Sequence, residues 1–221
     1  MRKFLLIIFC LCTTASFAQL KLGVEAGYNT SGFIDKGSDI QYFDLSRIPT
    51  FQAGIVAEQT LNKHFSASSG LIFFQKGGRK DKTVFATTGA STTSKFSYIQ
   101  IPLNLQYSIP LNKTLKALVG AGFYGGVGIS GTEKGTDEEI SGNITVVDNK
   151  VKFSNNPYYT SGTTYVKPLD FGYDVLVGLA YHQFEFKATL TNGFGNIYPT
   201  GSTRFANSVI GFTVAYLVPW K

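Results

Sequence analysis

Cysteine, histidine and long apolar runs are all scarce in this chain, and each shortage excludes a class of protein. The two cysteines, Cys10 and Cys12, both lie within residues 1–18. Phe9 and Leu11 precede them, where a lipid-modification site would need a small residue. If this segment is removed, the remaining chain has no disulfide, no thiol chemistry and no cysteine metal site.

Only one long apolar run is present, and it lies at the N-terminus. Residues 4–12 are all apolar, a basic pair precedes them, and Ser16 and Ala18 are small residues suited to cleavage. The run is too short to cross a bilayer as a helix, so it predicts a secretory signal peptide over residues 1–18. Residues 19–221 would then form a single exported domain, without a run long enough for a membrane-spanning helix.

Strong charge and high mean hydropathy are also lacking. The formal net charge is +6 at pH 7 and is spread along the sequence, which predicts no nucleic-acid partner. Mean hydropathy is close to zero. A membrane barrel alternates its apolar residues with polar ones, so its average hydropathy resembles that of a soluble protein. The pattern along the chain is therefore more informative than the average.

The clearest pattern is at the C-terminus. Every even position from Ile210 to Trp220 is aliphatic or aromatic, whereas the odd positions are mixed. A period of two with one apolar face predicts a β-strand. A final strand that ends on an aromatic residue is typical of bacterial outer-membrane barrels.

The same alternation predicts eight strands along the chain. Their expected ranges are 20–29, 51–61, 65–75, 97–109, 115–126, 169–181, 184–193 and 208–218. Three connections are tight (62–64, 110–114 and 182–183), and they alternate with four long ones (30–50, 76–96, 127–168 and 194–207). This asymmetry favours an all-β fold, an eight-stranded antiparallel up-and-down transmembrane β-barrel with periplasmic turns and external loops. Both termini would lie on the periplasmic side.

The apolar face is expected to point outward into lipid. Aromatic residues are predicted near both ends of the strands, with mostly Val, Ile, Leu and Ala between them, as the two interfaces of a bilayer select. Most strand glycines share the parity of the polar face, which suits the narrow interior of an eight-stranded barrel. A soluble barrel with an apolar interior would not sort aromatic residues by height.

Four segments resemble a known family. They are GVEAGYN (23–29), LNKHFSASSGLIFFQKGGR (61–79), YIQIPLNLQYSI (98–109) and VGAGFYGGVG (119–128). The chain is similar to the Bacteroidota-type outer-membrane β-barrel domain, the PorT-like family, over nearly all of residues 19–221. This resemblance implies an eight-stranded outer-membrane barrel and a link to protein secretion. It brings no catalytic or ligand motif.

Charged residues on the polar face predict an ion-pair network inside the barrel. Buried charges must be paired or hydrated, and opposite charges at similar heights suggest a plug. The predicted network contains Lys21, Glu25, Glu58, Lys116, Asp174, Glu185 and Lys187. Within it, Lys21, Lys116 and Lys187 are expected to neutralise Glu58 and Glu185.

A second polar set is predicted at the external rim. Gly77, Gly78 and Arg79 are interpreted as the exit turn of the third strand. The bases around this turn would lie where lipid A phosphates lie, because basic residues favour anionic headgroups. The predicted lipopolysaccharide contacts are Lys76, Arg79, Lys80 and Lys82.

The functional prediction is a non-enzymatic, monomeric outer-membrane barrel without cofactor or metal. Its expected partners are lipid, lipopolysaccharide, and envelope or secretion proteins that bind the loops. A narrow channel or small-solute transporter is the alternative. A lipid-modifying enzyme is disfavoured, because His64 and His182, the two histidines, fall in predicted periplasmic turns, away from external substrates.

Overall fold

The computed structural model describes residues 19–35, 43–82, 90–138, 143–158, 161–199 and 205–220. The predicted signal peptide, residues 1–18, lies outside these ranges. All regular secondary structure in the described ranges is β-strand. No helix in this part of the chain is long and apolar enough to cross a membrane.

Eleven strands form one sheet in the described residues. They are β1 (Leu20–Asp35), β2 (Phe43–Ser46), β3 (Ile48–Thr60), β4 (Phe65–Lys82), β5 (Ala90–Pro110), β6 (Leu115–Glu138), β7 (Ile144–Phe153), β8 (Thr163–Val166), β9 (Leu169–Tyr181), β10 (Phe184–Gly193) and β11 (Phe205–Pro219). Eight of them close into an antiparallel ring in the order β1-β3-β4-β5-β6-β9-β10-β11, and β11 pairs with β1. The all-β prediction and the eight-stranded ring are confirmed, but the structure adds β2, β7 and β8.

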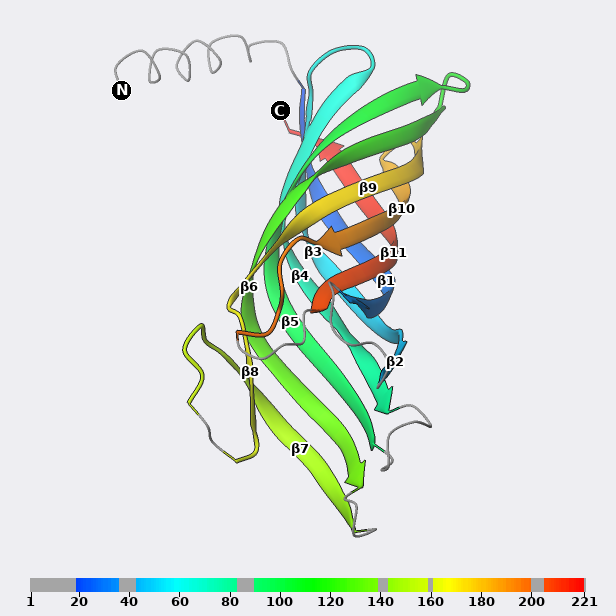
Figure 1. The fold of residues 1–221 in the computed structure, drawn as a ribbon. Coiled ribbons are helices and arrows are strands. Elements are labelled where there is room, and N and C mark those ends of the chain that lie inside the picture. Colours follow the sequence, from blue (N-terminus) through cyan, green and yellow to red (C-terminus); the bar gives the residue numbers. More distant parts are fainter. Residues whose placement is uncertain are drawn as a thin grey trace, which may run out of the picture.

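The short turns gather at one end of the ring, which we call the turn end (Figure 1). In two of these turns the side-chain oxygen of an asparagine, Asn62 or Asn112, accepts hydrogen bonds from the backbone amides two and three positions after it, at 2.8–2.9 Å. The third turn uses His182 with a φ of 54°. The start of β1 and the end of β11 also lie at this end, since the Trp220 amide donates to the Leu20 carbonyl at 2.7 Å. The opposite end is the loop end.

The apolar face of the ring points outward, as the alternation predicted. Leu103, Phe123 and Ile55 are more than half exposed, whereas Asn29 and Gln106 are completely buried inside. Aromatic pairs occur near both ends of the exterior, with ring centroids 5.0 Å apart for Phe184 and Tyr216 and 5.5 Å apart for Phe51 and Phe73. Such an apolar exterior is stable only when lipid or another apolar phase covers it.

β4, β5 and β6 continue at least seven residues beyond their predicted loop-end bounds, so the long connections 76–96 and 127–168 contain strand. β5 and β6 remain paired as far as Ala90 and Asp137, and β7 pairs with the far part of β6. The register of β5 against β6 shifts between Ser97 and Tyr98, which leaves Ile129 of β6 without a partner in β5. This β-bulge lies where β6 leaves the ring, and bulges bend and twist a strand. The extended strands project from the loop end (Figure 1).

An apolar cluster crosses the loop end of the ring. It consists of Phe33, Phe96, Tyr98, Val166, Ile197 and Phe205, all buried. The segment that follows β10 contributes Ile197, whose amide donates to the Phe205 carbonyl at 2.8 Å. We call this cluster the apolar cap, because it covers the interior on that side.

Replacement of Val175 by arginine should destabilise the barrel by about 2–4 kcal/mol, because it places a cation on the lipid-facing side of β9. The neighbouring Asp174 is buried on the opposite face and accepts a hydrogen bond from Thr191 at 2.6 Å. Asp174→Asn keeps an acceptor oxygen and should cost less. Urea unfolding in lipid vesicles measures both. The reverse order would mean that the two faces are exchanged, as a one-residue shift would cause.

Candidate functional site

The charged interior is the candidate site, and period-two alternation places its residues. Side chains of one parity on each ring strand point inward, so charges from β1, β3, β4, β9 and β10 meet in one narrow space. Gly172 makes room among them, because a Cβ there would overlap the Tyr124 ring and the Asn192 carbonyl. The inward charges are Lys21, Glu25, Glu58, Lys76, Asp170, Asp174, Glu185 and Lys187.

The half of the interior nearer the turn end contains two sets of ion pairs. Lys21 donates to Glu58 at 2.7 Å. Lys187 lies 3.5 Å from both Glu25 and Glu185, with its side chain only 10% exposed. We call these five residues the turn-side group. All five were predicted for the interior network, and the structure brings them together in these pairs.

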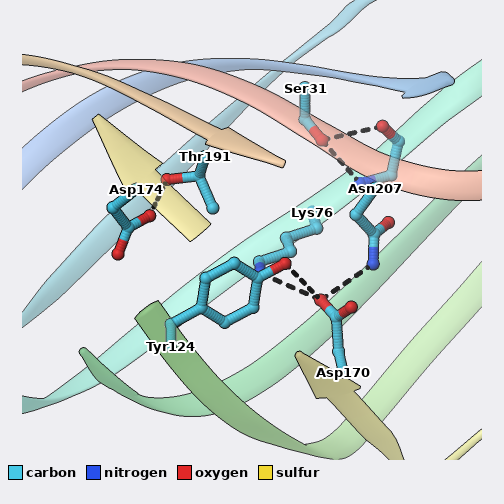
Figure 2. Close-up of polar contacts among 8 residues, drawn as sticks. Ser31, Lys76, Tyr124, Asp170, Asp174, Thr191 and Asn207 are labelled. Atoms are coloured by element: carbon cyan, nitrogen blue, oxygen red, sulfur yellow. Dashed lines mark hydrogen bonds and ion pairs between the residues drawn. The ribbon is translucent and has the colours of Figure 1, made fainter. Parts of the chain in front are cut away.

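The half nearer the loop end contains a cluster around Asp170 (Figure 2). Its carboxylate accepts hydrogen bonds from the Lys76 ammonium at 2.9 Å, the Asn207 amide at 3.1 Å and the Tyr124 hydroxyl at 3.3 Å. Lys76 is completely buried, and its ammonium lies 3.8 Å from the centre of the Tyr124 ring. This Asp170 cluster joins β4, β6, β9 and β11 across the barrel, and the predicted network did not include it.

Lys76 was predicted at the external rim, and the structure corrects that position. β4 does not end in a turn at Gly77 and Gly78 but continues to Lys82, so the inward parity of Ile72 and Phe74 extends to Lys76. The buried Lys76 cannot reach lipopolysaccharide. Lys76 lies two residues after Phe74, a spacing that predicts the same inward face of a continuing strand. Gly77 and Gly78 were interpreted as a turn, so this spacing was not used.

Lys80 has the same parity and also turns inward. Its ammonium donates to the Tyr198 hydroxyl at 2.6 Å and lies over the rings of Tyr198 and Phe205. Burial raises the pKa of the Tyr198 hydroxyl, while the nearby Lys80 ammonium opposes that rise. Arg79 points outward, half exposed, and pairs with Asp81 at 2.9 Å. The side chain of Lys82 lies outside the described residues.

Lys116 was expected to neutralise Glu58 and Glu185, and this expectation is wrong. Its side chain is exposed at the turn end and makes no ion pair with the residues that the structure describes. Lys21 and Lys187 neutralise the two glutamates instead. Lys116 does have the inward-facing parity that was predicted. Its position along the barrel axis depends on the stagger between neighbouring strands, which the sequence does not reveal.

The interior contains more carboxylates than ammonium groups. Asp174 has no lysine within ion-pair distance among the described residues and accepts a hydrogen bond from Thr191 instead. A cavity of about 50 Å³ lies beside it, lined by polar groups that include Glu25, Gln52 and Thr213. A polar cavity of that size holds a few water molecules, which hydrate such carboxylates.

Both histidines lie at the turn end, as predicted. His64 Nδ1 lies 3.2 Å from the Ser108 carbonyl oxygen, and its ring stacks on Tyr107. The His182 ring packs edge-on against Tyr181. Within the described ranges, no three His, Cys, Asp or Glu side chains are arranged to hold a metal ion.

Comparison with known proteins identifies a family. The sequence model of a family described as outer membrane protein beta-barrel domain matches residues 17–198. Similar solved structures include OprG of Pseudomonas aeruginosa, with 10% identity, a TM-score of 0.48, and coverage of 92% of this chain and 97% of that one. Ail of Yersinia pestis has 11% identity, a TM-score of 0.42, and coverage of 90% and 98%. The outer membrane protease OmpT of Escherichia coli has 10% identity, a TM-score of 0.42, and coverage of 91% and 96%. No curated protein matches this chain.

Lys76→Met should destabilise the folded barrel by about 3 kcal/mol or more, because it leaves the buried Asp170 carboxylate without its cation. The double variant Lys76→Met/Asp170→Asn should recover part of this loss. Arg79→Met is the matched control, since its pair is exposed and should contribute less than about 1 kcal/mol. Urea titrations in lipid vesicles compare the three. Equal effects of Lys76→Met and Arg79→Met would contradict the buried position of Lys76.

Proposed function

The chain belongs to the outer membrane protein beta-barrel domain family, and from this premise we propose that it is a non-enzymatic, non-conducting barrel. Its role would be to anchor a projecting β-sheet that binds a protein partner outside the membrane. The observation that carries this proposal is the length of β5 and β6 beyond the ring. A barrel that served only to span or perforate the membrane would not need these extensions.

The extensions are long by comparison with the membrane. β10 has 10 residues, close to the about 9–11 that a strand needs to cross a bilayer. β6 has 24 residues, and its last partner in β9 is reached at Val127. Residues 128–138 therefore continue for roughly 35 Å of strand, at about 3.3 Å per residue.

Large apolar side chains are exposed on the projecting sheet, which supports a binding role. Ile144 is 69% exposed and Val146 is 75% exposed, both on β7. These positions lie beyond the ring, where lipid tails do not cover them. Apolar groups that face water in this way mark interaction sites when they lie together. The resemblance to PorT-like barrels favours an envelope or secretion protein as the partner.

The interior supports the non-conducting part of the proposal. An eight-stranded barrel is just wide enough for its own side chains. Here the turn-side group, the Asp170 cluster and the apolar cap lie one after another along the path that an ion would take. A narrow channel remains the second candidate, because a pocket at the turn end and the cavity beside Asp174 provide some free volume.

Lipid contacts complete the proposal. The apolar exterior would be covered by outer-membrane lipid, and the closed ring leaves none of its eight strands with an open edge, which favours a monomer. Of the predicted contacts that the structure describes, Arg79 is exposed and remains a candidate for a lipopolysaccharide phosphate, and Lys82 stays a prediction. Its existing pair with Asp81 would weaken that contact.

Purified protein in planar bilayers should give conductance near background, because the two ion-paired layers and the apolar cap close the interior. Bilayers with an added porin provide the positive control. A stable and reproducible single-channel current in the wild-type protein would contradict the closed barrel and favour the channel.

Cysteine labelling on intact cells should test the orientation. The two native cysteines lie in the predicted signal peptide, so a single introduced cysteine reports alone. Val146→Cys on the projecting sheet should react with a membrane-impermeant maleimide on intact cells. Lys113→Cys at the turn end should react only after the envelope is ruptured. The opposite pattern would place the projecting sheet in the periplasm.

A further inference from the structure

A pocket opens into the barrel at the turn end. Its volume is about 210 Å³, below the roughly 300 Å³ at which pockets for drug-sized ligands begin. Leu118, Ala180 and Leu217 form part of its wall. Glu58 and Glu185 line both this pocket and the interior cavity of about 50 Å³, so they separate the two spaces.

The two glutamates of this pocket have ion-pair partners, whereas two of its lysines have none within the described ranges. Glu58 is neutralised by Lys21, and Glu185 lies 3.5 Å from Lys187. Lys113 and Lys116 also line the pocket. Neither makes an ion pair with the residues that the structure describes, so their positive charges remain available.

Within the part of the chain that the structure describes, the surroundings of the pocket add no competing carboxylate. None of the exposed side chains among the described turn-end residues is an aspartate or glutamate, and the exposed lysines and histidines there are Lys63, His64, Lys113, Lys116 and His182. The acids in this region, Glu58 and Glu185, are both buried. The potential at the pocket mouth is therefore positive, and a concave surface with walls of low dielectric strengthens such a potential.

Lys113 is held at the mouth by a rigid turn. The Asn112 side chain accepts hydrogen bonds from the amides of Thr114 and Leu115, and the Leu111 amide donates to the Leu115 carbonyl at 2.9 Å. Lys116 occupies the inward-facing position that follows in β6. Two lysines three positions apart on the same hairpin thus line one concave space.

We propose that this turn-end pocket binds a small anion, a phosphate or carboxylate group, between Lys113 and Lys116. Glu58 and Glu185 lie at the floor of the pocket, and their carboxylates repel an anion that moves deeper into the barrel. The anion therefore stays near the mouth, between the two lysines. The anion reaches the pocket from the periplasm, as a soluble metabolite or as the phosphate headgroup of an inner-leaflet phospholipid. This site is independent of the projecting sheet, which lies at the opposite end of the barrel.

The chain contains a matched control for this site. Leu61-Asn62-Lys63 begins the β3–β4 turn as Leu111-Asn112-Lys113 begins the β5–β6 turn, and both asparagines cap their turn in the same way. Lys63 therefore occupies the position equivalent to Lys113. It is exposed at the same end of the barrel but does not line the pocket.

The test is a titration of inorganic phosphate into folded, isotope-labelled barrel in phosphatidylcholine nanodiscs, at constant ionic strength. Amide NMR signals of Thr114, His182 and Gln183 should shift in a saturable manner. Lys113→Gln/Lys116→Gln should weaken the apparent Kd by at least about tenfold, the change expected for one lost charge-assisted contact. Lys63→Gln should leave the apparent Kd unchanged. Heat-modifiable migration on a gel checks that each variant is folded.

Two results would overturn the site. One is the absence of saturable shifts in the wild-type protein. The other is an equal weakening of phosphate affinity in Lys63→Gln and in the double variant, which would mean that phosphate responds to diffuse surface charge and not to this pocket. Phosphatidylglycerol added to the nanodiscs then identifies the source of the anion. If it weakens phosphate binding, the lipid headgroup occupies the pocket; if it has no effect, the ligand is a soluble anion.

Discussion

The pairing of β1 with β11 is the constraint on which the rest of the structure depends. The two strands are in register from Lys21 opposite Pro219 to Asp35 opposite Phe205, and this seam closes the ring. A backbone that is surrounded by lipid has no water to satisfy its amides and carbonyls, so an open edge would be very costly there. Closure also gives the sheet an outer face toward lipid and an inner face toward the barrel interior. Alternation then places most apolar side chains outside and sends most charged side chains of the membrane-spanning strands into a narrow interior.

The interior charges follow from that narrowness. In a space that side chains nearly fill, a carboxylate must meet an ammonium, a hydroxyl or a small volume of water. Glu58 and Glu185 meet lysines, Asp174 meets Thr191, and Asp170 meets three donors at once. The same contacts that make the charges tolerable also obstruct the barrel. The closed interior that we propose would follow from these contacts, and it would leave the two ends of the barrel as the sites of function.

The sequence predicted the ring well, because the bilayer imposes one repeating pattern. The predicted bounds of β9 and β10 agree with the structure, since alternation and short turns mark both. The pattern fails where the membrane ends. Residues 90–96 and 128–138 lack a continuous apolar face, so nothing in them distinguishes a strand in water from a loop. Lys76 was misplaced for a related reason, because Gly77 and Gly78 resemble a turn. The pairing of the interior charges depends on the stagger between strands, which one sequence does not contain.

The apolar cap links the loop end of the barrel to its seam. Phe33 lies on β1 and Phe205 on β11, and their rings stack with centroids 5.9 Å apart. These two strands come from opposite ends of the chain, so the contact forms only when the ring has closed. Until then Phe33 and Phe205 lack each other's ring, although Phe205 can still contact Tyr198 nearby in the chain. An unfinished barrel would thus expose aromatic surface that becomes buried on closure, and transiently exposed apolar surface of this kind makes incomplete folds prone to aggregation.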